Sequence, residues 1–186
     1  MTVEDFLDWA QERGDEKWEL RDGVPALKSS PRMPDTMERH VHLRAKLRAV
    51  TAFDRQIASQ ALPCEALPDG AAVTTTDGSL YLPDALIRCG EDAPEDEAVV
   101  TPDPVVVLEV LSPSNTDDEM TEKTRAYFTI PTVAHVLIVD TGRRRVRHYT
   151  RGDGDALVLR FLDGTATLEL VPPGLSLAVS DLLPLP

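Results

Sequence analysis

Two short runs of apolar residues stand out in the hydrophobic pattern of the chain. Residues 105–111 read VVVLEVL and residues 135–140 read HVLIVD, and both are rich in β-branched side chains. Continuous apolar runs of this length are typical of strands that are covered on both faces. The pattern therefore predicts that the first run is a central strand, with one acidic residue, Glu109, inside it, and that both runs belong to a packed core.

The spacing of apolar positions also predicts three helices. A short helix follows Thr2, whose hydroxyl can cap the segment VEDFLDWAQE, and it ends before Gly14. A long helix is expected over about Thr36 to Phe53, where apolar residues recur at near-helical intervals. A third is expected over about Asp117 to Thr129, because Pro131 stops it.

Hairpins and short strands account for most of the remaining chain. An Asp-Gly turn joins WELR to VPALK, and TGRR joins HVLIVD to RVRHYT. Further β-like runs are IASQAL at residues 57–62, AAVTTT, SLYLPDALIRC, LVLRFL and ATLEL, and residues 29–34 are expected to form a loop. Strands interspersed with helices predict an α/β (α+β) fold with added β-hairpins.

Length and composition indicate one globular domain over residues 1–186. A chain of this size with 42% hydrophobic residues can bury a core without a metal or disulfide. We expect a cytoplasmic protein, since no signal peptide is recognisable and no apolar run approaches the roughly 20 residues of a membrane span. Cys64 and Cys89 lie far apart in sequence without a second pair or a nearby His, so idle thiols are expected rather than a disulfide framework or a zinc site.

The formal net charge of −13 counts against tight binding of a polyanion such as DNA. Part of the imbalance is local, because residues 91–103 hold six acidic side chains and no Lys or Arg. Basic residues gather in residues 39–48 and in the five arginines between Arg143 and Arg151. These arginines could contact phosphate or could simply form an exposed basic hairpin, and the sequence leaves both interpretations open.

Two carboxylates are the first candidates for chemistry. Burying Glu109 in an apolar strand is costly unless the side chain is paired, protonated or bound to a cation. Asp84 follows Pro83 in another predicted strand, and two carboxylates on adjacent strands can share a magnesium ion with waters and a phosphate. Each acid also has a plain structural explanation, an ion pair for Glu109 and a turn cap for Asp84.

A cation near the scissile phosphate would complete such a site by stabilising negative charge. The usual position for this cation, two residues after the Glu, is Leu111 in this chain. The nearest Lys is Lys123, in the helix that follows the strand. Spacing alone favours a surface pair between Lys123 and Glu119 over a role in a site.

These residues, in their order and spacing, resemble the Uma-two family of restriction endonuclease-like proteins, which are grouped with the PD-(D/E)XK nucleases. The resemblance covers nearly the whole chain, through TVEDFL, WELRDG, LPDALI, VLEVLSPSN, EKTRAYFTIPTVAHVLIVD and LVPPGLSLAVSDLLP. It implies a restriction-endonuclease-like core, with a mixed central β-sheet flanked by helices. Two segments depart from the pattern, SSPRMPDTMERH and the acidic residues 91–103.

The resemblance implies a metal-dependent endonuclease that hydrolyses DNA phosphodiester bonds, with Mg²⁺ or Mn²⁺ as cofactor and a metal-activated water as nucleophile. Asp84 and Glu109 would hold the metal, and Lys123 would stabilise the transition state. Glu19 would be an auxiliary acid near the metal, although an exposed acid in a hairpin explains Glu19 about as well.

DNA is the expected partner, and a homodimer would suit the cutting of two strands. His40 and Ser112 are candidate substrate contacts, although a helical His is more often structural. The alternative function is a non-catalytic binding or scaffold protein that keeps the fold, supported by the net charge and the displaced Lys. A small-molecule hydrolase has little support, since no Gly-x-Ser-x-Gly, metal-histidine or phosphate-loop signature is present.

Overall fold

A computed structural model describes residues 1–14, 16–28, 39–90, 95, 97–112 and 115–184. The helices and strands within these residues are α1 Val3–Gln11, β1 Trp18–Arg21, β2 Val24–Leu27, α2 His40–Gln60, β3 Cys64–Pro68, β4 Val73–Thr74, β5 Leu80–Tyr81, β6 Ala85–Cys89, β7 Pro104–Val110, α3 Asp117–Thr129, β8 His135–Asp140, β9 Arg145–Arg151, β10 Leu157–Asp163, β11 Thr167–Leu170, β12 Leu175–Ala178 and α4 Val179–Leu182.

The central sheet is mixed, with the strand order β10-β9-β8-β7-β6-β3. β7 and β8 run parallel, while the pairs β6–β7 and β8–β9 are antiparallel. Every residue of β7 and β8 is buried, which confirms VVVLEVL as a central strand and HVLIVD as part of the core. A mixed sheet flanked by helices, with hairpins attached, confirms the expected fold class.

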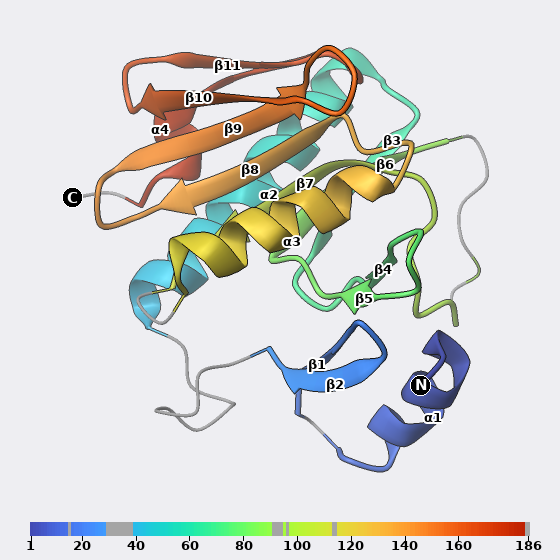
Figure 1. Ribbon diagram of the computed structural model, residues 1–186. Coiled ribbons are helices and arrows are strands. Elements are labelled where there is room, and N and C mark those ends of the chain that lie inside the picture. Colours follow the sequence, from blue (N-terminus) through green and yellow to red (C-terminus); the bar gives the residue numbers. More distant parts are fainter. Residues whose placement is uncertain (15, 29–38, 91–94, 96, 113–114, 185–186) are drawn as a thin grey trace.

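Helices cover both faces of this sheet (Figure 1). On one face, α2 contributes Ala45 and Phe53 to a core that also includes the β11–β12 hairpin. On the other face, α3 contributes Tyr127 and Phe128. Side chains alternate across β7, so Glu109 lies on the α3 face together with Val107.

A smaller sheet, in the order β2-β1-β5-β4, lies beside the α3 face (Figure 1). Its own core is formed by Phe6 of α1, Leu20 of β1 and Leu80 of β5. The predicted hairpin at Asp22-Gly23 is confirmed, and Thr2 caps α1 as expected. The hairpin carries Glu19 toward the end of β6.

One strand prediction in the middle of the chain is wrong. Residues 57–60 of IASQAL belong to α2, because Ile57 packs on the same buried face as Phe53. The helix therefore extends seven residues beyond the predicted end at Phe53. Its predicted start at Thr36 and the predicted loop at residues 29–34 lie outside the described residues.

The expectation of idle thiols is also wrong. Cys64 and Cys89 are directly opposite each other in the antiparallel pair β3–β6 and form a disulfide. Their separation of 25 residues gives no signal in the sequence, since the pairing depends on the strand register.

Candidate active site

Asp84 and Glu109 lie side by side at the centre of the protein. The backbone N–H of Asp84 donates to the carbonyl of Leu108 over 3.0 Å, which places Asp84 next to Glu109 on the neighbouring strand. Both side chains are buried, with 4% and 5% of their surface exposed. The backbone N–H of Val110 donates to Oδ2 of Asp84 over 2.7 Å and fixes that carboxylate.

Glu109 is held by two groups from α3. The hydroxyl of Tyr127 donates to Oε1 over 2.5 Å, and Nζ of Lys123 lies 2.7 Å from the same oxygen. Burial raises the pKa of Glu109, and the nearby Asp84 carboxylate raises it further against the opposing effect of Lys123. Burial, together with Glu109, also raises the pKa of Tyr127 well above its usual value.

Lys123 links Glu109 to Glu19. Its ammonium lies 2.7 Å from Oε1 of Glu19 as well, and the side chain is largely buried. Burial opposes its charge, but Glu109 and Glu19 outweigh burial and raise its pKa. The interpretation of Lys123 as a surface partner of Glu119 is therefore wrong, since Glu119 accepts from the N-cap residue Thr116 instead.

Glu19 is fully buried, so its interpretation as an exposed hairpin acid is also wrong. Arg21 binds Oε2 of Glu19 over 2.7 Å, and the backbone N–H of Leu82 donates to Oε1 over 3.2 Å. Burial favours the neutral form, but Lys123 and Arg21 outweigh it and lower the pKa of Glu19. The acid thus remains ionised and holds Lys123 in place.

Three further residues of the site carry no recognisable signal in the sequence. Nζ of Lys28, one residue after β2, lies 2.8 Å from Oδ1 of Asp84, and Nζ of Lys46, on α2, lies 3.1 Å from the same oxygen. Both ammonium groups also bind Asp69, over 2.8 Å and 2.9 Å. Asp69 follows β3, so three distant segments meet beside Asp84.

The ammonium groups control the ionisation of these two acids. Burial raises the pKa of Asp84, but Lys28, Lys46 and the N–H of Val110 outweigh it, so the net pKa is lowered. Asp69 behaves in the same way, with its pKa held well below the usual value by Lys28, Lys17 and Lys46. Asp84 therefore stays charged beside Glu109, whose pKa is raised.

Locally, the charges of this cluster nearly balance. Among the described residues that form its ion pairs, the acids are Glu19, Asp69, Asp84 and Glu109, and the cations are Lys17, Lys28, Lys46, Lys123 and Arg21. The net charge of −13 thus does not extend into the site. A phosphate approaching the cluster meets no excess of negative charge, which weakens the electrostatic objection to DNA.

The two candidate substrate contacts lie near the ends of elements that reach the site. His40 is the first residue of α2 and is exposed, while Lys46 lies further along the same helix. Ser112 follows β7, and its backbone N–H donates to the side chain of Asn115 over 2.9 Å. Within the part of the chain that the structure describes, the side chains of Asp84 and Glu109 bind other residues than these two.

The arginines of residues 143–151 are engaged within the protein. Arg147 binds Asp117 over 2.8 Å, and Arg143 binds Asp140 over 3.3 Å. Arg151 donates to the backbone carbonyls of Phe128, Ile130 and Val133. These contacts favour a structural role over phosphate binding for this hairpin.

The donors of the site fit a hard divalent cation in their chemistry. Asp84 and Glu109 present carboxylates from adjacent strands, and Oε2 of Glu109 takes no hydrogen bond or ion pair from the described residues. No group of three or more His, Cys, Asp or Glu side chains within the described ranges forms a metal site. Magnesium accepts one or two carboxylates when waters and a phosphate complete its octahedral shell, so the pair is sufficient.

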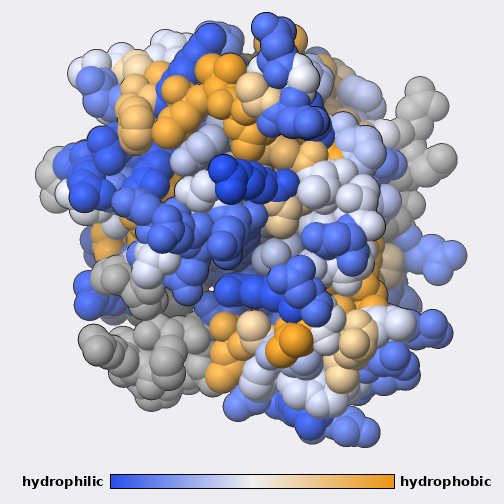
Figure 2. All heavy atoms as spheres, viewed as in Figure 1, coloured by the Kyte–Doolittle hydropathy of each residue, from blue (hydrophilic) through white to orange (hydrophobic). Residues whose placement is uncertain are grey.

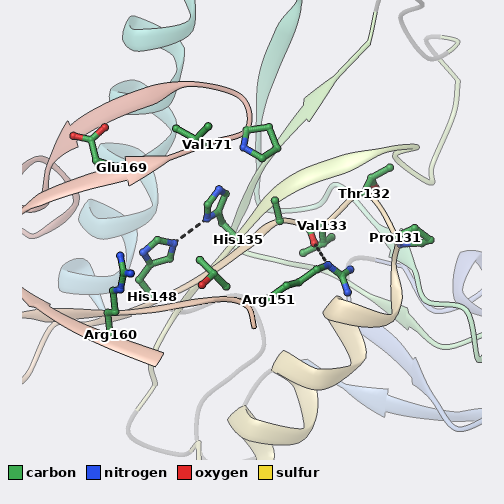
Figure 3. A pocket seen from close by; sticks show the side chains of 12 residues that line it. Pro131, Thr132, Val133, His135, His148, Arg151, Arg160, Glu169 and Val171 are labelled. Carbon is green, nitrogen blue, oxygen red and sulfur yellow. Dashed lines mark hydrogen bonds between the residues drawn. The ribbon is translucent and has the colours of Figure 1, made fainter. Parts of the chain in front are cut away.

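A second polar region lies on the opposite face of the sheet. His135 of β8 and His148 of β9 are buried, and Nδ1 of His135 lies 2.9 Å from Nε2 of His148. The two rings point toward each other in a pocket of about 540 Å³, with Arg160 and Glu169 on its walls (Figure 3). Burial lowers the pKa of both histidines, and that of His148 falls to about 4.

Comparison with known proteins identifies a family and a similar fold. Residues 3–180 match the Uma2 family, described as "Putative restriction endonuclease". A solved structure of a "putative nuclease belonging to DUF820" from Anabaena variabilis ATCC 29413 is similar, with a TM-score of 0.73 and 17% identity over 98% of this chain and 97% of that chain. No curated protein matches the sequence. None of the described helices has the length and apolar character needed to cross a membrane.

Proposed function

The chain belongs to the Uma2 family, and from this premise we propose that it is a metal-dependent endonuclease that hydrolyses DNA phosphodiester bonds. One observation carries the proposal. Two carboxylates, Asp84 and Glu109, are buried next to each other on adjacent strands, and the ammonium of Lys123 lies 2.7 Å from one of them. Burying this much charge is costly, and catalysis at a phosphate gives a reason for it.

In this proposal, Asp84 and Glu109 would hold Mg²⁺ or Mn²⁺, and the ion would lower the pKa of a water molecule that serves as the nucleophile. Lys123 stabilises the negative charge that develops on the phosphate oxygens. Glu19 does not need to bind the metal, because its contacts with Lys123 and Arg21 make it the residue that positions Lys123. Tyr127 fixes the orientation of Glu109.

The proposal treats residues 1–186 as one nuclease unit that acts on DNA in the cytoplasm as a homodimer. The dimer is supported by symmetry alone, since two sites suit two strands. Sedimentation equilibrium tests it directly: a mass of twice 20.4 kDa supports the dimer, and the mass of a single chain rejects it.

The test of the function combines Mn²⁺ binding by calorimetry with nicking of supercoiled plasmid. Wild type should bind Mn²⁺ and nick the plasmid, and Glu109→Gln should lose both because a carboxylate ligand is replaced by an amide. Glu169→Gln is the matched control, since Glu169 lies on the opposite face and contacts Ser176. Loss of both signals in Glu169→Gln, or their persistence in Glu109→Gln, would contradict the proposed site.

A non-catalytic binding protein is the second candidate. The ammonium groups of Lys28 and Lys46 on Asp84 favour it, because they already neutralise a carboxylate that the metal would use. Wild type that neither binds Mn²⁺ nor nicks DNA, but still binds a DNA duplex, would support this candidate over the nuclease.

A further inference from the structure

Three lysines converge on one carboxylate beside the proposed metal site. Asp69 binds Lys17, Lys28 and Lys46 over 2.7 to 2.9 Å. Lys28 and Lys46 also reach Oδ1 of Asp84, whereas Lys17 binds only Asp69 among the ion pairs of the described residues. The three lysines therefore share Asp69 but differ in their contact with Asp84.

We propose that Lys28 and Lys46 are internal counter-ions that compete with the divalent cation for Asp84, and that Asp69 retains them when the cation binds. The inference rests on the proposed function, because it assumes that Asp84 is a metal ligand. It adds a role for three residues that lie outside the proposed catalytic set. The competition would set how much metal the protein needs before its site fills.

Competition follows from the oxygens that Asp84 has available. Oδ2 accepts from the N–H of Val110 inside the sheet, so Oδ1 is the oxygen that faces the cluster. The ammonium groups of Lys28 and Lys46 lie 2.8 Å and 3.1 Å from Oδ1. A divalent ion binds a carboxylate oxygen at about 2.1 Å, so it would take the same position and repel both ammonium groups.

The burial of the two lysines makes this repulsion strong. Each side chain is only 12% exposed, so water screens its charge weakly. Lys17 has the same formal charge, but its side chain is 44% exposed and its ion pair is with Asp69. Removal of Lys28 or Lys46 should therefore matter far more to a bound cation than removal of Lys17.

Asp69 offers the displaced ammonium groups a second partner. Lys28 already binds its Oδ1 and Lys46 already binds its Oδ2, so neither lysine has to move into the solvent when it leaves Asp84. Both charges stay paired with Asp69, which limits the cost of displacement. Without Asp69, Lys28 would keep only its ion pair with Asp84 among the ion pairs of the described residues.

The test measures Mn²⁺ affinity by calorimetry, without DNA, for wild type and single variants. Lys28→Met and Lys46→Met should each bind Mn²⁺ about tenfold more tightly, as expected when a like charge next to the ion is removed. Lys17→Met, the matched control, should stay within about twofold of wild type because its charge is screened. Asp69→Asn should weaken binding.

The outcomes separate this inference from the proposed function. If Lys28→Met and Lys46→Met bind Mn²⁺ as tightly as wild type or more weakly, the competition is overturned. If Glu109→Gln still loses binding in the same experiment, the nuclease proposal stands. An equal gain of Mn²⁺ affinity in Lys17→Met would also overturn the competition, since the loss of any nearby positive charge would then explain the effect. Absence of binding in wild type and in every variant would overturn both.

Misfolding is controlled by circular dichroism and by testing the two lysines separately. Lys28→Gln and Lys46→Gln keep polarity where methionine is not tolerated, and they carry the same expectation. Binding of Mn²⁺ by any of these folded variants but not by wild type would support the competition. If Asp69→Asn is the one variant that folds, its Mn²⁺ affinity still tests the inference. An affinity equal to that of wild type would contradict the proposal that Asp69 retains the displaced lysines.

Discussion

At the scale of single residues, the pKa values of the two central acids are shifted in opposite directions although the residues are neighbours. Lys28 and Lys46 keep the pKa of Asp84 below its usual value, whereas burial raises the pKa of Glu109. Environments that shift the pKa values of neighbouring carboxylates in opposite directions are common at catalytic sites. The difference arises because α2 and the hairpin supply cations to Asp84, while α3 supplies a neutral donor and one cation to Glu109.

Tyr127→Phe tests the buried hydrogen bond that fixes Glu109. Loss of this donor leaves a buried carboxylate with one partner fewer, so the free energy of unfolding should fall by about 1 to 3 kcal/mol. Urea unfolding at neutral pH measures the change. Tyr81→Phe is the matched control, because the ring centroids of Tyr81 and Tyr127 lie 5.4 Å apart and the Tyr81 hydroxyl makes no hydrogen bond to the described residues. Equal losses in both variants would contradict a specific role for the Tyr127 hydroxyl.

Only part of this site could be predicted from the sequence. Glu109 stands out because it interrupts an apolar strand, and the family resemblance selects Asp84, Lys123 and Glu19. Lys28 and Lys46 could not be predicted, because nothing in their spacing relates them to Asp84. Their contacts arise only when the hairpin and α2 pack against the end of β6.

At the scale of elements, strand register decides which side chains meet. The register of β6 with β7 places Asp84 beside Glu109, and the register of β3 with β6 places Cys64 opposite Cys89. The sequence predicted most strands and helices, because apolar runs and caps are local signals. It misassigned residues 57–60, where Ile57 is β-branched but continues the buried face of α2.

The cross-link between β3 and β6 gives a prediction about stability. The double variant Cys64→Ser with Cys89→Ser should lose roughly 3 kcal/mol of unfolding free energy, the value expected when a loop of this size is no longer closed in the unfolded chain. The loop is defined by a sequence separation of 25 residues. Urea unfolding of the variant and of wild type with dithiothreitol should give matching losses. A variant as stable as oxidised wild type would show that the cross-link contributes nothing.

At the scale of the whole molecule, one face shows hydrophilic and hydrophobic residues gathered in separate areas (Figure 2). In the view of Figure 2, hydrophilic residues gather across the middle, while hydrophobic residues gather toward β10, where Val158, Leu159 and Phe161 are exposed. The net charge of −13 therefore describes the chain as a sum and not the neighbourhood of its site, where acids and cations nearly balance. A formal charge taken from composition cannot show this separation.

The two faces of the sheet also give the molecule two different responses to acid. On the α3 face, Asp69 and Asp84 have lowered pKa values, so the stability they contribute is present above about pH 4 and is lost as the pH falls further. On the α2 face, the pKa of His148 falls from 6.5 to about 4. As the pH falls, His148 takes up a proton in the unfolded chain before it does so in the folded protein. The free energy of unfolding therefore decreases as the pH falls from about 6.5 toward 4.

His148→Phe isolates the second response. Between pH 7.5 and pH 5.0, wild type should lose about 1 to 2 kcal/mol of unfolding free energy through His148, whose buried ring lines a pocket. The variant cannot take up this proton, so its decline over the same interval should be smaller by that amount. Urea unfolding at the two pH values measures it, and His40→Phe is the control because His40 is exposed. If the free energy of unfolding declines equally in wild type and His148→Phe, the acid sensitivity in this interval comes from other groups. His135, whose Nδ1 lies 2.9 Å from Nε2 of His148, is then the first to test.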